Sequence, residues 1–239
     1  MTVVWFNSKP PETRFAPYVS IPIYVNETGT PKDLNARLRE QMLAFEDHVK
    51  NEELVTEVKK APNDFYAWTQ HWKQHNLFFD SPVLAGEHLK RFSMTDDLTE
   101  LLGMIRYEYL LFLRELGYPR ETVYIHAWGN VLRREEFISF HNHSSEPSCY
   151  LSGTYYLTTN DTTLDLLNPT KWDHKAKFPT KEGNIVMFPG YVQHASTQLA
   201  EDTLRISIAF DICTSVNAEM NPWRSYHLFD DPNSMPGLD

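Results

Sequence analysis

The stretch NIVMFPGYVQHASTQLAEDTLRISIAFDI, residues 184–212, decides the fold that the sequence predicts. Its two ends, Asn184–Pro189 and Thr203–Ile212, are short runs rich in β-branched and aromatic residues, and such runs favour strands. The segment between them has no helical repeat. The stretch therefore predicts two strands that follow one another without a helix between them.

Three runs of the same character lie upstream, at Thr122–Val131, Cys149–Thr158 and Thr163–Leu167. Turns rather than helices separate these runs. Several short strands in succession are typical of an antiparallel sandwich or barrel. We therefore expect a β core from about residue 120 onward.

The front of the chain carries two helical patterns instead. Thr30 is a good N-cap with Pro31 after it, and apolar residues then recur at helical spacing over residues 31–50. A second apolar face follows the N-cap candidate Thr95 and ends at Gly117. Helices first and strands afterwards predict an α+β fold.

Two other parts of the front half are less regular. Val19–Val25 predicts a strand, which we place at a sheet edge because Pro22 has no backbone N–H to donate. Residues 51–94 mix aromatic and polar residues without a clear period, and we expect loops and short helices there.

The composition excludes several classes of protein. The 239 residues include 22 basic and 32 acidic side chains, a net charge of −10, so we expect no nucleic-acid partner and no binding to acidic membranes. No apolar run approaches the roughly 18 residues of a membrane span, and the first residues lack the features of a signal peptide. Two cysteines do not make a disulfide framework. We therefore expect a cytoplasmic protein, with its oligomeric state open.

Three of the ten histidines form a pattern that suits a metal ion. His141 and His143 are two residues apart, so in an extended segment both imidazoles point to the same face. His194 lies far downstream, just after the predicted strand Asn184–Pro189. A local pair with a distant third ligand is the layout of facial sites that hold non-haem Fe(II). Two solvated loop side chains are the alternative for the pair.

Arg205 is a cation inside an otherwise apolar and small-residue strand, RISIAF. An unpaired buried charge is costly, so an inward-facing guanidinium needs a carboxylate. Bidentate pairing suits a dicarboxylic cosubstrate, and the hydroxyl of Ser207 lies on the same face. The alternatives are that Arg205 pairs with an internal acidic residue or faces solvent.

The order of the motifs resembles that of the 2-oxoglutarate/Fe(II)-dependent oxygenase superfamily, in the family with an HxH…SGxYY…FP…H…RxS pattern. The matching motifs are WGN at 128–130, HNH at 141–143, LSGTYYL at 151–157, LNP at 167–169, GNIVMFPGYVQH at 183–194 and RISIAF at 205–210. Each motif is weak alone, but their joint order is fairly specific. The resemblance covers roughly residues 120–212.

The resemblance implies a double-stranded β-helix, or jelly roll, with the N-terminal helices packed outside it. The whole chain, 1–239, would be a single oxygenase domain. Its parts would be a mainly helical segment 1–119, a jelly-roll core 120–215 and a C-terminal tail 216–239.

The resemblance also implies a chemistry: hydroxylation of a substrate with O2, with 2-oxoglutarate converted to succinate and CO2. The substrate would be a small molecule, an amino acid or a protein side chain. The residues implied are His141, His143 and His194 for Fe(II), Arg205 and Ser207 for 2-oxoglutarate, Tyr155 or Tyr156 for a further hydroxyl, and Asn130 and Trp128 for the pocket wall.

One position departs from the superfamily pattern. The residue two after the first ligand is usually Asp or Glu, and here it is His143. Three neutral ligands leave both charges of Fe(II) uncompensated. Two alternatives therefore stay open: a three-His iron dioxygenase that uses no 2-oxoglutarate, and a non-catalytic β-sandwich binding protein.

Overall fold

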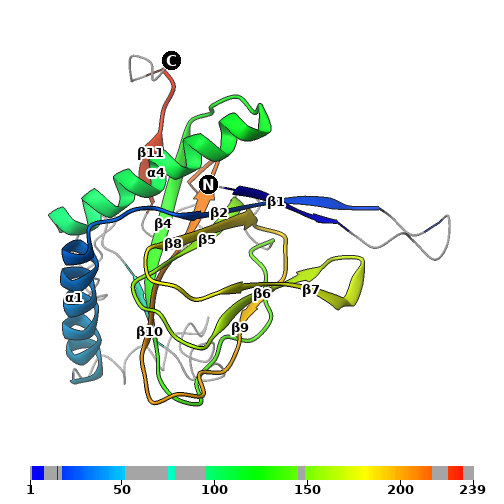
Figure 1. Cartoon of the computed structure of the whole chain (residues 1–239). Coiled ribbons are helices and arrows are strands. Elements are labelled where there is room, and N and C mark those ends of the chain that lie inside the picture. Colours follow the sequence, from blue (N-terminus) through cyan, green and yellow to red (C-terminus); the bar gives the residue numbers. More distant parts are fainter. Residues whose placement is uncertain are drawn as a thin grey trace, which may run out of the picture.

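The computed structural model has an α+β fold in which two helices cover one side of a mainly antiparallel β core (Figure 1). It describes residues 2–7, 15, 18–51, 75–78, 95–144, 149–216 and 226–233. Most of residues 51–94, where we expected loops and short helices, lies outside the described residues. Residues 75–78 of that stretch form a strand.

Both predicted helices are confirmed. They are α1, Lys32–Asn51, and α4, Asp96–Leu116. The Thr95 hydroxyl accepts the Leu98 N–H at 3.2 Å, which is the N-cap expected from the sequence. Gly117 ends α4 with a left-handed φ of 67°, a conformation that glycine adopts without strain. Neither of these helices is long and apolar enough to cross a membrane.

The large sheet has eight strands, paired antiparallel in the order β1-β2-β8-β5-β10-β4-β11, with β3 pairing β4 separately. The strands are β1 Thr2–Asn7, β2 Ser20–Glu27, β3 His75–Phe78, β4 Val123–Leu132, β5 Cys149–Tyr156, β8 Asn184–Pro189, β10 Arg205–Cys213 and β11 His227–Asp230. The strands from the N-terminal part of the chain thus belong to the same sheet as those of the predicted β core.

The predicted strand at Val19–Val25 is β2, but our expectation that it lies at an edge was wrong. β2 lies between β1 and β8. Pro22 is tolerated because β8 pairs only with residues 24–27 of β2, so the proline lies beyond that ladder.

The small sheet has three strands in the order β7-β6-β9. They are β6 Thr163–Asn168, β7 Lys171–Pro179 and β9 His194–Ser196. The segment before residue 144 runs beside β9 and exchanges backbone hydrogen bonds with it at His141. The large and small sheets together form the jelly-roll core that the sequence predicts.

The two faces of the large sheet have different environments, because side chains alternate along a strand. On β10, Ile206, Ile208 and Phe210 join the apolar cluster that contains the buried residues of α1 and α4. Arg205 and Ser207, of opposite parity, are buried and face away from the helices. A second apolar cluster, with residues of β2, β6 and β8, fills the space between the two sheets. The helices therefore cover the outside of the large sheet, and its inner face is left for the site.

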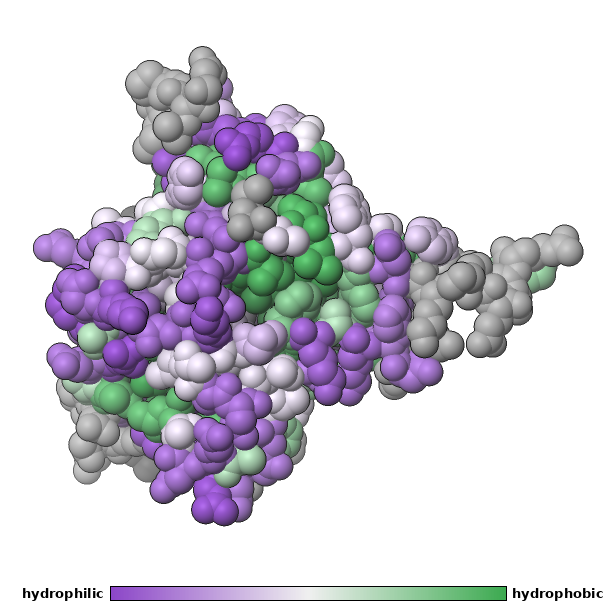
Figure 2. Space-filling view, in the orientation of Figure 1, coloured by the Kyte–Doolittle hydropathy of each residue, from purple (hydrophilic) through white to green (hydrophobic). Residues whose placement is uncertain are grey.

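The surface is mainly hydrophilic on the face that Figure 1 presents. Figure 2 shows a large hydrophobic area in the upper middle of this face and a smaller one at its lower left, with hydrophilic side chains around them. A surface of this kind is expected for a chain with 32 acidic and 22 basic residues.

The C-terminal segment returns to the sheet as β11, which pairs with β4. The Asp230 carboxylate is fully buried, and Arg106 of α4 and Arg120 each donate to it at 2.8 Å. Burial raises the pKa of Asp230, but the hydrogen bonds from the two guanidinium groups outweigh burial and hold the pKa below its ordinary value. This ion-pair group ties β11 to α4.

Close packing leaves no room for a side chain at Gly153 of the LSGTYYL motif. We therefore expect Gly153→Ala to destabilise the protein. A Cβ at this position would collide with the ring of Phe210, its Cα partner on β10. Overpacking of this kind costs about 1–3 kcal/mol. Urea unfolding followed by circular dichroism measures the loss; Gly103→Ala is the matched control, because a Cβ there meets nothing within 4 Å. An unchanged midpoint for Gly153→Ala would contradict this account.

Candidate metal centre

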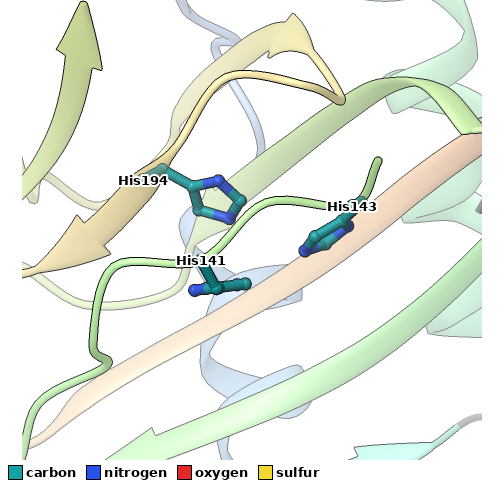
Figure 3. Close-up of side chains that lie close together, drawn as sticks. All are labelled: His141, His143 and His194. Atoms are coloured by element: carbon teal, nitrogen blue, oxygen red, sulfur yellow. The ribbon is translucent and has the colours of Figure 1, made fainter. Parts of the chain in front are cut away.

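Three histidine rings come together between the two sheets (Figure 3). His194 projects from β9, and His141 and His143 come from the segment beside it. The ring centroids are 4.2 Å apart for His141 and His194, 5.2 Å for His141 and His143, and 5.1 Å for His143 and His194. One ring nitrogen from each lies within 4.8 Å of the others, close enough to hold one metal ion.

Main-chain hydrogen bonds hold these residues in place. The His141 N–H donates to the His194 carbonyl at 3.0 Å, and the His194 N–H donates back at 2.8 Å. The His143 N–H donates to the Gly190 carbonyl at 2.9 Å. Two residues that are distant in sequence are therefore fixed side by side by the backbone alone.

The hydrogen bonds of the rings determine which nitrogen can bind a metal. Nδ1 of His141 lies 2.8 Å from the Ser139 carbonyl, and Nδ1 of His194 lies 3.1 Å from the Val192 carbonyl. A carbonyl can only accept, so each Nδ1 carries the proton and each Nε2 is the nitrogen whose lone pair can bind a metal. Such outer partners are typical of metal-binding histidines.

The environment keeps two of the rings neutral. Burial, with a smaller effect of His143, lowers the pKa of His141 to about 4. Burial lowers the pKa of His194 well below its ordinary value. Neutral imidazole is the form that binds metals, so these two ligands need lose no proton near neutral pH.

Arg205 lies on the inner face of β10 and is 2% exposed. Its Cζ lies 5.5 Å from the centroid of the Tyr156 ring. Its Nε and Nη1 atoms have no hydrogen-bond acceptor among the residues that the structure describes. Burial lowers the pKa of the guanidinium, although an arginine stays charged. The internal acidic partner that we considered from the sequence is thus not seen in the described part of the chain, and the site suits an anion.

Polar residues that we predicted for the cosubstrate surround Arg205. Ser207 lies between its Cα partners Asn130 on β4 and Tyr156 on β5, and all three are buried. The Asn130 Oδ1 atom has no hydrogen-bond partner among the described residues, and the Tyr156 hydroxyl interacts with Arg205. These groups present both donors and acceptors to a ligand beside Arg205.

The choice between the two tyrosines of the SGTYY strand is decided by the face on which each lies. Tyr155 points toward the helices, where its hydroxyl donates to Asn35 of α1 at 2.8 Å. Tyr156 points the other way, toward Arg205. Tyr155 is therefore not part of the group around the inner face.

The inner face of β10 runs from Arg205, beside which an anion could bind, to Asp211, which contacts His143 of the histidine cluster. From Arg205 to Asp211 this face carries the small side chains of Ser207 and Ala209. Six residues of strand span roughly 20 Å, and the long arginine side chain covers part of that distance. A small ligand can therefore extend from the histidines toward the guanidinium without a bulky β10 side chain in between.

Sequence reasoning missed Asp211. Its carboxylate is completely buried, and its Oδ1 lies 2.5 Å from Nδ1 of His143. The Ser152 hydroxyl also donates to this oxygen, at 2.9 Å. A signal was present in the sequence, because Asp211 has the same strand parity as Arg205 and Ser207 in the run RISIAFD.

Trp128 and Phe188 pack near the histidines. The Trp128 ring lies 5.9 Å from that of His143, and Phe188 meets His194 edge-on at 4.8 Å. Trp128 was predicted to line the pocket, and it lies on the same face of β4 as Asn130. These aromatic contacts restrict the orientation of the two imidazoles.

Comparison with known families gives one match. Residues 126–211 match the model of the family described as "Putative 2OG-Fe(II) oxygenase". The matched segment contains the three histidines, Arg205 and Asp211. No curated protein matches the chain by sequence.

Solved structures with a similar fold include a prolyl-4-hydroxylase from Pseudomonas putida, with a TM-score of 0.55 and 12% identity over 80% of this chain and 92% of that one. HygX from Streptomyces hygroscopicus, solved with nickel and 2-oxoglutarate bound, has a TM-score of 0.54 and 9% identity over 81% and 82%. The viral collagen prolyl hydroxylase vCPH from Paramecium Bursaria Chlorella virus-1, in its 2OG complex, has a TM-score of 0.50 and 12% identity over 81% and 96%. At these identities the likeness shows the fold alone.

Proposed function

We propose that the chain is an Fe(II)- and 2-oxoglutarate-dependent oxygenase that hydroxylates its substrate, and the match of residues 126–211 to the 2OG-Fe(II) oxygenase family model supports this proposal. In this proposal His141, His143 and His194 hold the iron. Arg205, with Ser207, Asn130 and Tyr156 around it, binds the far carboxylate of 2-oxoglutarate.

One observation carries the proposal: a buried guanidinium, with two nitrogen atoms that have no hydrogen-bond acceptor among the described residues, lies on the same inner surface as the histidine cluster. Burying a cation without a partner is costly, so a protein that keeps one has a use for it. The planar fork of arginine matches a carboxylate bidentately. A dicarboxylate that reaches from the metal to Arg205 satisfies both halves of the site.

The donor set fits the metal. Three imidazoles leave coordination positions open, which is how non-haem iron sites admit a cosubstrate and O2. When bound, Fe(II) supplies the activation of O2 that oxidises a C–H bond while 2-oxoglutarate is converted to succinate and CO2. The residues of the chain bind and orient the reactants and keep water from the buried end of the site.

The substrate is a small molecule, an amino acid or a protein side chain. Two of the residues flanking the ligands in sequence are exposed aromatics, Phe140 before His141 and Tyr191 before His194. Lys175 lies 4.7 Å above the Phe140 ring. Aromatic faces of this kind can stack on an apolar or cationic substrate group.

Anaerobic titration tests the proposed function directly. With one equivalent of Fe(II), added 2-oxoglutarate will produce a visible metal-to-ligand charge-transfer band, and admission of O2 will yield succinate. No band together with no succinate would contradict the proposal. Oxygen consumption indifferent to 2-oxoglutarate would instead identify a three-His dioxygenase, in which Arg205 binds a carboxylate of the substrate.

A further inference from the structure

We propose that Asp211 is a positioning residue of the iron site. Its carboxylate orients the His143 imidazole and supplies, from behind that ligand, the negative charge that an Asp or Glu ligand supplies directly in most of the superfamily. This inference rests on the proposed function, because it concerns the same site.

The contact between Asp211 and His143 is buried and supported by a neighbouring side chain. Asp211 is 0% exposed, and its Oδ1 lies 2.5 Å from His143 Nδ1. The Ser152 hydroxyl donates to the same oxygen at 2.9 Å, and lies 3.2 Å from His143 Nδ1. A buried carboxylate on the central strand β10 is therefore aimed at one ring nitrogen and supported by a neighbour on β5.

This partner differs in charge from those of the other two ligands. Backbone carbonyls accept from His141 and His194, whereas a carboxylate accepts from His143. A carboxylate behind an imidazole fixes its tautomer, with Nε2 toward the metal, and makes it a stronger donor. His143, which stands where the superfamily usually has Asp or Glu, is thus the proposed ligand whose Nδ1 contacts a carboxylate, that of Asp211.

The charges then balance as they do in a site with a carboxylate ligand. Fe(II) with three neutral imidazoles carries two positive charges, and the nearby Asp211 reduces the local sum to one. In a buried site of low dielectric, the charge of the Asp211 carboxylate interacts strongly with a metal ion even when the His143 ring lies between them. The negative charge that the site lacks at His143 is therefore supplied by Asp211.

A competing arrangement uses Asp211 as a direct ligand, because His143, Cys149 and Asp211 also have donor atoms within 4.8 Å of one another. Two atoms that each lie about 2.0–2.2 Å from one tetrahedral zinc ion are more than about 3 Å apart. The 2.5 Å separation between His143 Nδ1 and Asp211 Oδ1 is shorter than that and is a hydrogen-bond distance. The geometry thus favours a supporting role for Asp211.

The first test is Asp211→Asn, which keeps the shape of the side chain and removes its charge. We expect anaerobic Fe(II) affinity to fall roughly 10–100-fold and the Fe(III)/Fe(II) reduction potential to rise, since the lost charge stabilised the ferric ion more than the ferrous ion. Asp230→Asn is the matched control: it removes another buried carboxylate, paired with arginines at β11, and leaves affinity and potential unchanged. Cys149→Ser also leaves metal binding unchanged, and a loss of metal there would overturn the proposal in favour of direct ligation.

A second set of variants tests the role of Asp211 if Asp211→Asn folds poorly. In His143→Asp two carboxyl groups lie close together and share a proton that Fe(II) must displace, so it should bind Fe(II) more weakly than a variant with a single carboxylate. The double variant His143→Asp/Asp211→Asn has one carboxylate, now in the ligand position, and should bind Fe(II) more tightly than either single variant. A merely structural role for Asp211 predicts no such recovery, and a double variant no better than the singles would overturn the inference.

Failure of this inference can be told apart from failure of the proposed function. If the unaltered protein does not bind Fe(II), the proposed function fails whatever Asp211 does. If the unaltered protein binds Fe(II) and Asp211→Asn matches it in affinity and potential, the site is real and the role assigned to Asp211 is wrong.

Discussion

A His194→Ala variant will keep its fold and lose stoichiometric Fe(II) binding. In the proposed site His194 is one of three ring ligands, and the remaining His141–His143 pair would be a weak chelate by itself. The loss should therefore exceed the roughly 10–100-fold that removal of an outer-shell partner costs. The backbone bonds between residues 141 and 194 do not involve the ring, so β9 stays in place. Metal analysis after anaerobic loading and desalting measures the effect.

His227→Ala is the matched control for this experiment. His227 lies on β11, which pairs with the β4 edge of the large sheet and lies outside the histidine cluster. We expect this variant to retain one equivalent of Fe(II), with unchanged circular dichroism in both proteins. A His194→Ala protein that still holds one equivalent would show that the three-histidine site is not the metal site.

An Arg205→Met variant will lose 2-oxoglutarate binding and yet be more stable than the unaltered protein. The affinity should fall by at least about thirtyfold, because truncating one partner of a buried charge pair costs about 2–5 kcal/mol. In the absence of the cosubstrate, the same change removes a buried cation that has no acidic partner among the described residues and keeps an apolar side chain of similar length. Replacing buried charges in this way stabilises proteins by up to about 1–4 kcal/mol. Urea unfolding without 2-oxoglutarate, and titration with it, measure the two effects.

Arg205→Lys separates charge from shape in this prediction. Lysine retains the cation but not the bidentate fork, so we expect intermediate affinity and no gain in stability. Two results would contradict the account: an Arg205→Met protein that binds 2-oxoglutarate normally, or one that unfolds at lower urea in the absence of the cosubstrate. The first would remove Arg205 from the site, and the second would mean that the guanidinium has an internal partner.

Local signals account for what the sequence predicts well. The caps at Thr95 and Gly117 and the helical apolar face between them define α4 without reference to the rest of the molecule. The six runs read as strands are β2, β4, β5, β6, β8 and β10, each with enough β-branched or aromatic residues to stand out. Strands with little apolar character are missed. β7, KWDHKAKFP, is mostly polar and charged, and β9 has only three residues, so both exist through pairing with β6.

The site shows the same limit. Strand parity places Arg205 and Ser207 on one face of β10, but it does not show which face points inward. The sequence alone therefore does not distinguish Tyr155 from Tyr156, and the position of the helices does. Asp211 was missed because an acidic residue near a strand end is usually solvated, and only its contact with His143 across a distance of 68 residues reveals its role. The strand parity that Asp211 shares with Arg205 and Ser207 is a local signal, but it does not identify a partner that is distant in sequence.

The reciprocal backbone bonds between His141 and His194 also affect the thermodynamics of metal uptake. Closing a loop of about fifty residues lowers the chain entropy, and this loss occurs when the protein folds, before any ion arrives. Zinc fingers differ, because their chains become ordered only as the ion binds. Here backbone hydrogen bonds, and not an ion, hold residues 141 and 194 side by side, so metal uptake does not have to drive folding. In the proposed enzyme, iron would therefore exchange without unfolding of the jelly roll around it.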